Sequence, residues 1–451
     1  MTSVDPVPRR CLAIVLAAGE GKRMHSRKPK VLHELAGRSM LAHTLAAVAA
    51  AGADRIAVIV GAGQEAVTAE AKRAAPGADI FIQSAPLGTA HAVLAAKAAI
   101  AEGFDDILVA FADTPLVRPA TFAALRRALV ERQASVVVLG FEARDPTGYG
   151  RLILDGAALV AIREHKDLHE SELGLAICNA GLMALAGQHG LALLESIGKA
   201  NAQGEYYLTD AVGIARAQGL EAAMMSVSEE EVLGINDRQQ LATAEAVLQG
   251  RLRGEAMRAG VTFFDPDSVH LSFDTELAPD VTVEPNVFFG PGVRVEAGSL
   301  IRAFSHLEGA LVGENAVIGP FARLRPGAEL SQEVHIGNFV EVKAARLGVG
   351  VKANHLAYIG DATIGARTNI GAGTITCNYD GFAKFRTEVG EGAFIGVNSA
   401  LVAPVKIGAG AYIGTGSVIT KDVDADALAV ARERQIQKPG WAAAFREKHK
   451  K

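Results

Sequence analysis

The chain has 451 residues and a formal net charge of −5, from 45 Lys and Arg against 50 Asp and Glu. At roughly 100–200 residues per domain, this length predicts two to four domains. With 49% hydrophobic and 21% charged residues, the composition excludes a largely disordered chain and supports a large core. The slightly acidic balance excludes a strongly basic nucleic-acid-binding protein, so we expect no nucleic acid among the partners.

Cysteine usage and hydropathy indicate the compartment. The three cysteines, Cys11, Cys178 and Cys377, are too few and too far apart for a disulfide scaffold and favour reducing conditions. No uninterrupted run of 18 apolar residues could form a transmembrane helix, and the run Leu12–Leu16 is too short for a signal peptide. We therefore expect a cytoplasmic protein without membrane insertion.

Up to about residue 230, short apolar runs alternate with Ala-rich stretches. The runs predict buried strands over Leu12–Leu16, Ile56–Val60, Ile107–Phe111 and Ser135–Leu139. The stretches predict helices such as Met40–Ala51 and Thr89–Ala101. This alternation predicts a Rossmann-like α/β domain, a mostly parallel sheet with helices on both faces. Ligands of such sheets bind at the carboxyl ends of the strands.

From about residue 281, aliphatic residues recur at intervals of about six positions. Three hexapeptides would form one triangular coil of a left-handed parallel β-helix, with the aliphatic side chains inside. The repeat positions, with a one-residue slip before Leu300, are Val281, Val287, Val293, Leu300, Val312, Ile318, Leu324, Leu330, Ile336, Val342, Ile359, Ile364, Ile370, Leu401, Ile407, Ile413 and Ile419. The repeat is interrupted at Lys343–Tyr358 and Thr376–Val389, where we expect functional loops.

A polar, Ala-rich stretch joins the two halves. Asp237–Ala259 contains no Pro and is followed by Gly260, which predicts a helix. The expected domains are residues 1–238, a helical linker at 239–259 and a β-helix at 260–451; an ordinary surface helix is the alternative for the linker. In the basic tail, Trp441 either lies loose or docks on the β-helix.

A glycine-containing loop, Leu16-Ala-Ala-Gly-Glu-Gly-Lys-Arg-Met24, directly follows the first predicted strand. Gly19 and Gly21 allow the backbone to approach a phosphate, and Arg23 adds a charged donor. Lys30, behind Pro29, could reach the same phosphate. Taken singly, the glycine loop is equally consistent with an ordinary structural turn, and a lone lysine is more often a solvated surface charge.

Asp113 immediately follows the predicted strand Ile107–Phe111 and therefore stands at a carboxyl end. A carboxylate there could hold a divalent cation or cap a helix before Pro115. The segments so far resemble the sugar-nucleotidyltransferase signature. Further segments appear in that family's order: Gln83 with Leu87–His91, Asp113–Leu116, Gly148–Arg151, Glu164–Asp167, Asn179–Gly181 and Gly234–Arg238.

The resemblance extends over nearly the whole chain to the family of bifunctional N-acetylglucosamine-1-phosphate uridyltransferases and glucosamine-1-phosphate acetyltransferases. It implies a Mg²⁺ site at Asp113 and Asn236. It also implies a nucleotide- and sugar-binding set of Leu16, Ala17, Ala18, Gly19, Arg23, Lys30, Gln83, Gly88, Thr89, Phe111, Ala112, Asp113, Gly150, Glu164, Asn179 and Asn236. Two departures are Phe111-Ala112, where the family usually has Tyr-Gly, and Lys22, where threonine is common.

In the second half, acetyl transfer to an amine needs a base, and His suits this because its ordinary pKa is about 6.5. The resemblance implies that His355 is this base and that the acetyl site lies between the subunits of a homotrimer. It implies substrate binding by Arg325, Lys343, Tyr358 and Asn369, and acetyl-CoA binding by Ala372, Asn378, Tyr379, Val397, Thr415 and Arg432. Val397 replaces the family's usual serine, and the stretch before Val312 is shorter than usual by roughly one coil.

The implied function is acetylation of glucosamine 1-phosphate by acetyl-CoA, followed by transfer of uridylyl from UTP to N-acetylglucosamine 1-phosphate. The product would supply cell-envelope polymers. The alternatives are a single-activity nucleotidyltransferase with a structural or effector-binding β-helix, and a non-catalytic sugar-nucleotide sensor. A zinc site at Cys377 and His355 has too few ligands to be favoured.

Overall fold

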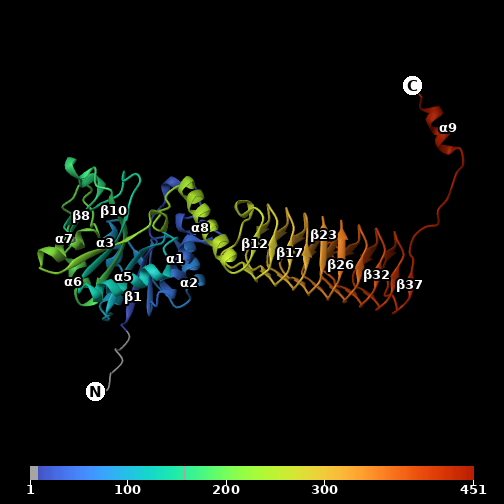
Figure 1. Ribbon diagram of the computed structural model, residues 1–451, viewed down its shortest axis with the longest axis horizontal. Coiled ribbons are helices and arrows are strands. Elements are labelled where there is room, and N and C mark those ends of the chain that lie inside the picture. The colour runs from blue at the N-terminus through green and yellow to red at the C-terminus, as the bar shows by residue number, and fades with distance from the viewer. Residues whose placement is uncertain (1–8, 157, 451) are drawn as a thin grey trace, which may run out of the picture. The chain divides into compact units, whose positions relative to one another are not determined.

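The computed structural model describes residues 9–156 and 158–450, and its internal contacts divide the chain between Leu248 and Gln249. Each unit is described by itself (Figure 1). Within the described residues, no helix is both long and apolar enough to cross a membrane.

The first unit is built on one mixed sheet with the strand order β11-β7-β10-β6-β1-β4-β5, and β8 and β9 pair beside β10. Its strands are β1 (Cys11–Leu16), β4 (Arg55–Gly61), β5 (Asp79–Gln83), β6 (Asp106–Phe111), β7 (Val136–Glu142), β8 (Arg151–Asp155), β9 (Ala158–Arg163), β10 (Ile177–Ala186) and β11 (Ala222–Val227). A separate small ladder joins β2 (Glu34–Leu35) and β3 (Arg38–Ser39). The pairs β1–β4, β1–β6, β4–β5 and β7–β11 are parallel, whereas β10 runs antiparallel to both β6 and β7. The predicted strands and the mostly parallel sheet are therefore confirmed.

Alternate residues of β1 serve two separate cores. Ala13 and Val15 pack with α1 (Met40–Ala50), α2 (Glu65–Ala74) and α5 (Pro119–Glu131). Leu12 and Ile14 pack on the other face of the sheet with α3 (Thr89–Leu94), α4 (Lys97–Ile100), α6 (Gly187–Glu195) and α7 (Asp210–Ala217). Because successive side chains of a strand point to opposite faces, one continuous apolar run fills both cores.

The predicted single helix Thr89–Ala101 is wrong, since the stretch forms two short helices, α3 and α4. Between them the backbone bonds shorten to three-residue steps, from Ala95 N to Ala92 O and from Ala96 N to Val93 O. No Gly or Pro marks this break in the sequence.

The helix predicted between the two halves is confirmed as α8 (Arg238–Arg258). The Asp237 side chain caps its first turn by accepting a hydrogen bond from the Gln240 N–H at 2.8 Å. The boundary between the two units, at Leu248 and Gln249, falls within α8. The assignment of residues 239–259 as a separate linker stays a prediction.

The second unit is a left-handed parallel β-helix whose coils follow one another in chain order (Figure 1). Three parallel sheets form its sides. Sheet C contains β12 (Thr262–Phe263), β14 (Thr282–Val283), β17 (Leu300–Ile301), β20 (Val317–Ile318), β23 (His335–Asn338), β26 (Lys352–His355), β29 (Asn369–Ile370), β32 (Phe394–Ile395), β35 (Tyr412–Ile413) and β37 (Leu428–Ala429). Sheet D contains β15 (Phe288–Phe289), β18 (His306–Leu307), β21 (Arg323–Leu324), β24 (Glu341–Lys343), β27 (Tyr358–Gly360), β30 (Ile375–Cys377), β33 (Ala400–Val402) and β36 (Val418–Ile419). Sheet E contains β13 (Glu276–Leu277), β16 (Arg294–Val295), β19 (Ala310–Val312), β22 (Ala328–Leu330), β25 (Ala345–Leu347), β28 (Ala362–Ile364), β31 (Thr387–Val389) and β34 (Val405–Ile407).

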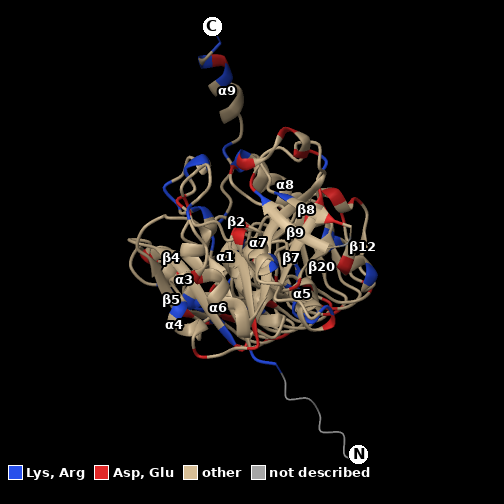
Figure 2. Ribbon diagram, turned by 90° about the vertical axis from the view of Figure 1, so that its left-hand side faces the viewer, with Lys and Arg blue, Asp and Glu red and all other residues tan. Residues whose placement is uncertain are grey.

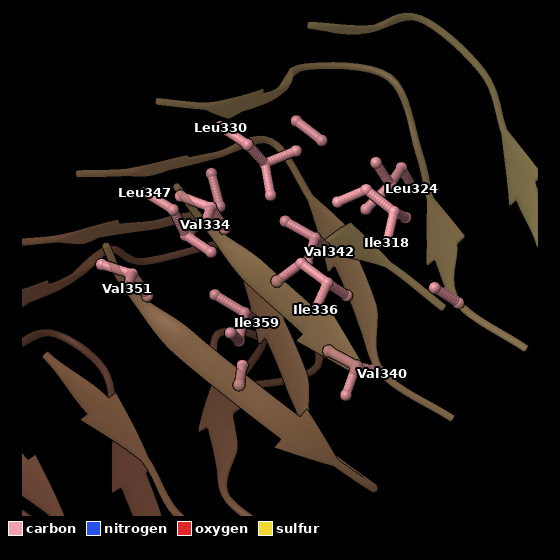
Figure 3. Packing of buried hydrophobic residues seen from close by; sticks show 14 of the residues in the cluster. Ile318, Leu324, Leu330, Val334, Ile336, Val340, Val342, Leu347, Val351 and Ile359 are labelled. Carbon is pink, nitrogen blue, oxygen red and sulfur yellow. The ribbon is translucent and has the colours of Figure 1, made fainter. Parts of the chain in front are cut away.

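The hexapeptide pattern predicted the core of this β-helix. Ile318, Leu324, Leu330, Ile336 and Val342 are buried inside it on successive sides of two neighbouring coils, as Figure 3 shows. The expected slip at Leu300 is wrong: Ile301 is the fully buried residue there, whereas Leu300 is only partly buried. The shorter step, of five residues, falls between Leu307 and Val312, which are both buried.

One of the two predicted interruptions is also wrong. Across Lys343–Tyr358 the coil continues through β25 and β26, with Leu347 and Ala353 in the inward positions. The polar residues there face outward from a regular coil. The second interruption is confirmed, because β30 ends at Cys377 and β31 begins at Thr387, which leaves a loop over residues 378–386.

The tail ends in the short helix α9 (Trp441–Lys448), which carries basic and acidic residues (Figure 2). Trp441 is 57% exposed and stacks on Phe445 of the same helix at 5.0 Å between ring centroids. Of the two alternatives for Trp441, the described structure therefore shows the exposed one.

Candidate functional site

A cavity of about 340 Å³ lies at the carboxyl end of β1 in the first unit. Its lining brings together most of the nucleotide-binding residues predicted from sequence. These are Leu16, Ala17, Ala18, Gly19, Lys30, Gln83, Gly88, Thr89, Phe111 and Asp113. The position agrees with the rule that open α/β sheets bind ligands beyond the ends of their strands.

Two glycines in left-handed conformations shape this cavity. Gly21 has φ +63°, and a Cβ at this position would lie 2.4 Å from Cβ of Lys30. Gly88 has φ +116°, and its added Cβ would meet the Tyr206 carbonyl oxygen at 2.5 Å. A larger residue at either position would therefore displace Lys30 or the segment that carries Tyr206.

A buried cation lies between the two predicted metal ligands. Lys30, which is 9% exposed, places its Nζ 2.5 Å from Oδ2 of Asp113 and 3.1 Å from Oδ1 of Asn236. Asp113 follows β6, and the backbone N–H of Ile235 donates to the Asp113 carbonyl, which fixes the Asn236 segment beside it.

The donor set fits a hard divalent cation. One carboxylate oxygen and one amide oxygen already converge on a single positive group, the Lys30 ammonium. Mg²⁺ prefers oxygen ligands and is commonly held by one or two protein groups together with water and substrate phosphates. Asp113 and Asn236 could therefore hold such an ion once phosphates engage Lys30.

A second cavity, of about 260 Å³, adjoins the first and shares Thr89, Phe111 and Asp113 with it. It is lined by the three residues predicted to hold the sugar, Gly150, Glu164 and Asn179. Thr209, which the sequence reasoning missed, donates from its hydroxyl to Oε1 of Glu164 at 3.1 Å. Burial raises the pKa of the Glu164 carboxyl, and the nearby carboxylates of Asp167 and Asp210 act in the same direction.

Three predicted residues, Arg23, Ala112 and Asn236, line neither cavity, although Asn236 contacts Lys30 of the first. Ala112 is fully buried, and its N–H donates to the Leu16 carbonyl, so it presents no group to a nucleotide. Arg23 is exposed and lines neither cavity. Lys22, the departure from the family pattern, pairs with exposed Glu20 at 2.8 Å.

In the second unit, His355 lies at the end of β26 with its ring exposed. Its Nδ1 is 2.7 Å from Oδ1 of Asn338, the residue paired with it on β23. Because an amide oxygen only accepts, Nδ1 carries the proton and the Nε2 lone pair of the neutral ring is free.

The predicted acetyl-CoA residues continue the same column of the β-helix. His355, Ala372, Val397 and Thr415 each lie two positions after a paired inward residue of sheet C, namely Ala353, Ile370, Ile395 and Ile413. Arg432 extends the column by donating to the Thr415 carbonyl at 2.9 Å. A long ligand lying along this edge would thus meet all four positions and end at His355.

A separate cluster of cations and polar groups lies at the carboxyl ends of the middle strands of sheet D, β21, β24, β27 and β30. Lys343 Nζ is 3.9 Å from Oδ2 of Asp361, and Nδ2 of Asn378 donates to the same oxygen at 2.5 Å. Arg325, paired with Glu341 at 2.7 Å, lies on the preceding coil. The pKa of Lys343 is lowered chiefly because the Lys384 side chain lies against it, with burial acting in the same direction. Such a group of cations suits a phosphate.

The structure therefore brings together Arg325, Lys343, Tyr358 and Asn378, whereas the described hydrogen bond of the His355 side chain goes to Asn338. Asn369 and Tyr379 are placed on β29 and in the loop, and the Tyr379 hydroxyl donates to the Gly381 carbonyl. Sequence reasoning missed Asn338, Asp361 and Lys384. Lys384 alone carried a usable signal, since it is a cation in the predicted loop.

The proposed zinc pair also stays apart. Cys377 ends β30 in sheet D, whereas His355 ends β26 in sheet C. Within the described residues, no three His, Cys, Asp or Glu side chains form a group that could hold a metal.

Comparisons with known proteins agree with both halves of the chain. A family model described as a MobA-like NTP transferase domain matches residues 13–176, and one described as bacterial transferase hexapeptide (six repeats) matches residues 386–421. Proteins named bifunctional protein GlmU are similar along nearly the whole chain. Those of Azorhizobium caulinodans, Bradyrhizobium sp. strain ORS 278 and Xanthobacter autotrophicus are 60%, 59% and 61% identical, each over 97% of this chain and 98% of the relative.

Proposed function

Because the chain belongs to the family of bifunctional GlmU proteins, we propose that it catalyses two successive group transfers. It transfers acetyl from acetyl-CoA to glucosamine 1-phosphate. It then transfers uridylyl from UTP to the N-acetylglucosamine 1-phosphate so formed and releases pyrophosphate. The product, UDP-N-acetylglucosamine, supplies cell-envelope polymers such as peptidoglycan and lipopolysaccharide. The observation that carries this proposal is the presence, in separate units, of two residue clusters suited to two different chemistries.

The first unit performs the uridylyl transfer. A phosphate oxygen of the sugar phosphate attacks the α-phosphorus of UTP, and the bond to the bridging oxygen breaks as pyrophosphate leaves. Lys30 and Arg23 contact the phosphates, Gln83 and the Gly88 backbone contact the base, and Glu164 and Asn179 hold the sugar. Nucleotidyl transfer in this family uses a divalent metal, which we assign as Mg²⁺ on Asp113 and Asn236; when bound, it neutralises charge on the phosphates.

The second unit performs the acetyl transfer. The amine nitrogen of glucosamine 1-phosphate attacks the thioester carbonyl, the C–S bond breaks, and CoA leaves as the thiol. His355 accepts the amine proton at Nε2, because its Nδ1–H is committed to Asn338. Arg325, Lys343 and Lys384 bind the sugar phosphate, and Tyr358 and Asn369 hold the sugar. Acetyl-CoA lies along Ala372, Val397 and Thr415, with Arg432 at its phosphates and Asn378 and Tyr379 near the thioester.

The β-helix assembles as a homotrimer with shared acetyl sites. An exposed apolar column, here called the corner stripe, runs along successive coils beside the His355 column; its residues are Phe304, Phe321, Phe339 and Leu356, between 45% and 61% exposed. The three rings stack at 5.0 and 5.2 Å. Sheet E instead carries paired charges on its outer face, such as Arg346 with Glu329 and Lys406 with Glu388. This contrast supports burial of the corner stripe against a second copy and exposure of sheet E to solvent. A second copy at the stripe would supply the polar cluster that His355 lacks within its own chain.

A cytoplasmic location agrees with the substrates and with the thiols. Cys11, Cys178 and Cys377 are all free, and burial raises the pKa of the Cys11 thiol to about 12. Such a thiol is unreactive and needs no disulfide partner.

Two single variants test the two-site proposal. His355→Ala removes the base and is expected to abolish acetyl transfer while leaving uridylyl transfer intact. Asp113→Ala is expected to do the reverse. If either variant lost both activities while remaining folded and trimeric, the two-site proposal would be wrong. If wild-type protein never released CoA and His355→Ala left uridylyl transfer unchanged, the β-helix would be a scaffold of a single-activity nucleotidyltransferase.

A further inference from the structure

One carboxylate holds two of the proposed substrate-binding side chains of the acetyl site. Asp361 follows β27 at a corner of the coil, and its side chain is 18% exposed. Its Oδ2 accepts a hydrogen bond from Nδ2 of Asn378 at 2.5 Å and lies 3.9 Å from Nζ of Lys343.

This contact fixes which end of the Asn378 amide is available. Asn378 is 8% exposed, and its Nδ2 lies 3.4 Å from the Tyr358 hydroxyl as well as 2.5 Å from Asp361. The amino end of the side chain is thereby committed, and no described residue donates to Oδ1. Because a carboxylate can only accept, the amide cannot turn over without placing oxygen against oxygen.

The same carboxylate acts on Lys343. Lys384 and Arg325 are both cations close to Lys343 and oppose its charge, whereas Asp361 favours it. Asp361 and the Glu341 that pairs with Arg325 are two carboxylates beside three cations, so one net positive charge remains for an incoming phosphate.

We propose that Asp361 is a positioning residue of the acetyl site: it orients Asn378 so that Oδ1 accepts an N–H of the glucosamine amine, and it anchors Lys343 at the sugar phosphate. This inference rests on the proposed acetyl transfer. Asp361 itself does not touch the reacting atoms and acts through Asn378 and Lys343.

The test replaces Asp361 by its neutral isostere in the full-length protein. We expect Asp361→Asn to lower kcat/KM for glucosamine 1-phosphate by about 10- to 100-fold, mainly through KM, since a charged hydrogen-bond partner is lost. The KM for acetyl-CoA, the trimer, the thermal midpoint and uridylyl transfer should stay unchanged. Glu388→Gln is the matched control, because Glu388 pairs with Lys406 on the exposed outer face of sheet E. Should Asp361→Asn fail to assemble, Asp361→Ser takes its place.

A double-mutant comparison separates positioning from a general structural role. In an Asn378→Ala background, adding Asp361→Asn should lower kcat/KM for glucosamine 1-phosphate by only about threefold or less, because Asp361 would no longer have the Asn378 amide to orient. The inference would be overturned if the double variant lost kcat/KM by the full product of the losses in the two single variants. It would also be overturned if Asp361→Asn alone left the KM for glucosamine 1-phosphate unchanged. Failure of the proposed function would look different: wild-type protein would then release no CoA from acetyl-CoA with glucosamine 1-phosphate.

Discussion

The ammonium of Lys30 lies 2.5 Å from the Asp113 carboxylate, at the place where that carboxylate and the Asn236 amide oxygen converge. A protein cation thus already joins the two side chains to which we assign the divalent metal. A metal held by the same two oxygens would compete with Lys30, and the phosphates of UTP would give its ammonium another partner. We therefore expect metal affinity to depend on whether nucleotide is present.

Replacing Lys30 by Met should strengthen metal binding in the absence of nucleotide. Removing one positive charge next to the site should tighten Mn²⁺ binding, with Mn²⁺ as a paramagnetic probe for Mg²⁺, by at least about fivefold. Uridylyl transfer should fall in the same variant, because the phosphates lose a charged contact. Electron paramagnetic resonance titration of free Mn²⁺ measures the affinity without any turnover.

Lys28→Met is the control for this prediction. Lys28 is a nearby lysine that pairs with exposed Glu34 at 2.9 Å instead of with the metal ligands. Its loss should leave Mn²⁺ affinity nearly unchanged. Equal affinities in Lys30→Met and wild type would show that Lys30 does not compete with the metal.

Removing the Asn338 side chain should slow acetyl transfer without blocking it. Asn338→Ala deletes the acceptor of the His355 Nδ1–H, so the ring samples the tautomer in which Nε2 carries the proton and cannot accept one. We expect kcat to fall by on the order of 10-fold, with little change in KM for either substrate. A rise in KM for both substrates together with the fall in kcat would argue for a structural loss instead.

The raised pKa of Glu164 predicts a specific dependence of stability on pH. The folded protein holds this carboxyl proton more tightly than the unfolded chain does, because burial disfavours the ionised form. The stabilising contribution of Glu164 is therefore fully present below the unfolded pKa, about 4.3, and is lost as pH rises through the higher folded value. Glu164→Gln, which cannot ionise, should have a higher thermal midpoint than wild type at pH 7 and a smaller advantage at pH 4. Calorimetry at the two pH values tests this. A difference in thermal midpoint between Glu164→Gln and wild type that grows at low pH would contradict it.

A charge placed in the corner stripe should separate the trimer. Phe339 is 56% exposed and stacks on Phe321, so Phe339→Asp would put a carboxylate into the proposed contact between copies. Sedimentation should show monomers, acetyl transfer should be lost because we propose that its site is shared between copies, and uridylyl transfer should persist. Leu311→Asp is the matched control, since Leu311 is 50% exposed on the outer face of sheet E. Separation by Leu311→Asp and not by Phe339→Asp would place the contact on the opposite side.

The periodic features of the chain were predictable from sequence, and the side-chain partnerships were not. The six-residue recurrence from Ile318 to Val342 predicted the β-helix because each side of every coil needs an inward-pointing apolar residue. The loop after Cys377 was predictable for the same reason, as a gap in that recurrence. The interruption expected before Tyr358 was wrong because Ala353 is small enough to fill an inward position without looking like a repeat residue.

Contacts between coils depend on register, which the sequence does not reveal. Asn338 meets His355 and Asp361 meets Asn378 across 17 residues in each case, whereas the loop lengthens the next coil so that Ala372 is followed by Val397. In the first unit, Lys30 and Asn236 are 206 positions apart and meet where the Ile235 N–H donates to the carbonyl of Asp113. Motifs could therefore nominate Lys30, Asp113 and Asn236, but only the structure shows that the lysine occupies the space between the other two.

The central claim, that two linked transfers reside in one chain, is tested most directly by one assay with two readouts. Purified protein is supplied with glucosamine 1-phosphate, acetyl-CoA, UTP and Mg²⁺, and free thiol and pyrophosphate are followed separately. We predict release of both, with pyrophosphate appearing only when acetyl-CoA is present. Pyrophosphate released from N-acetylglucosamine 1-phosphate and UTP, with no thiol ever released from acetyl-CoA and glucosamine 1-phosphate, would contradict the account and reduce the β-helix to a scaffold.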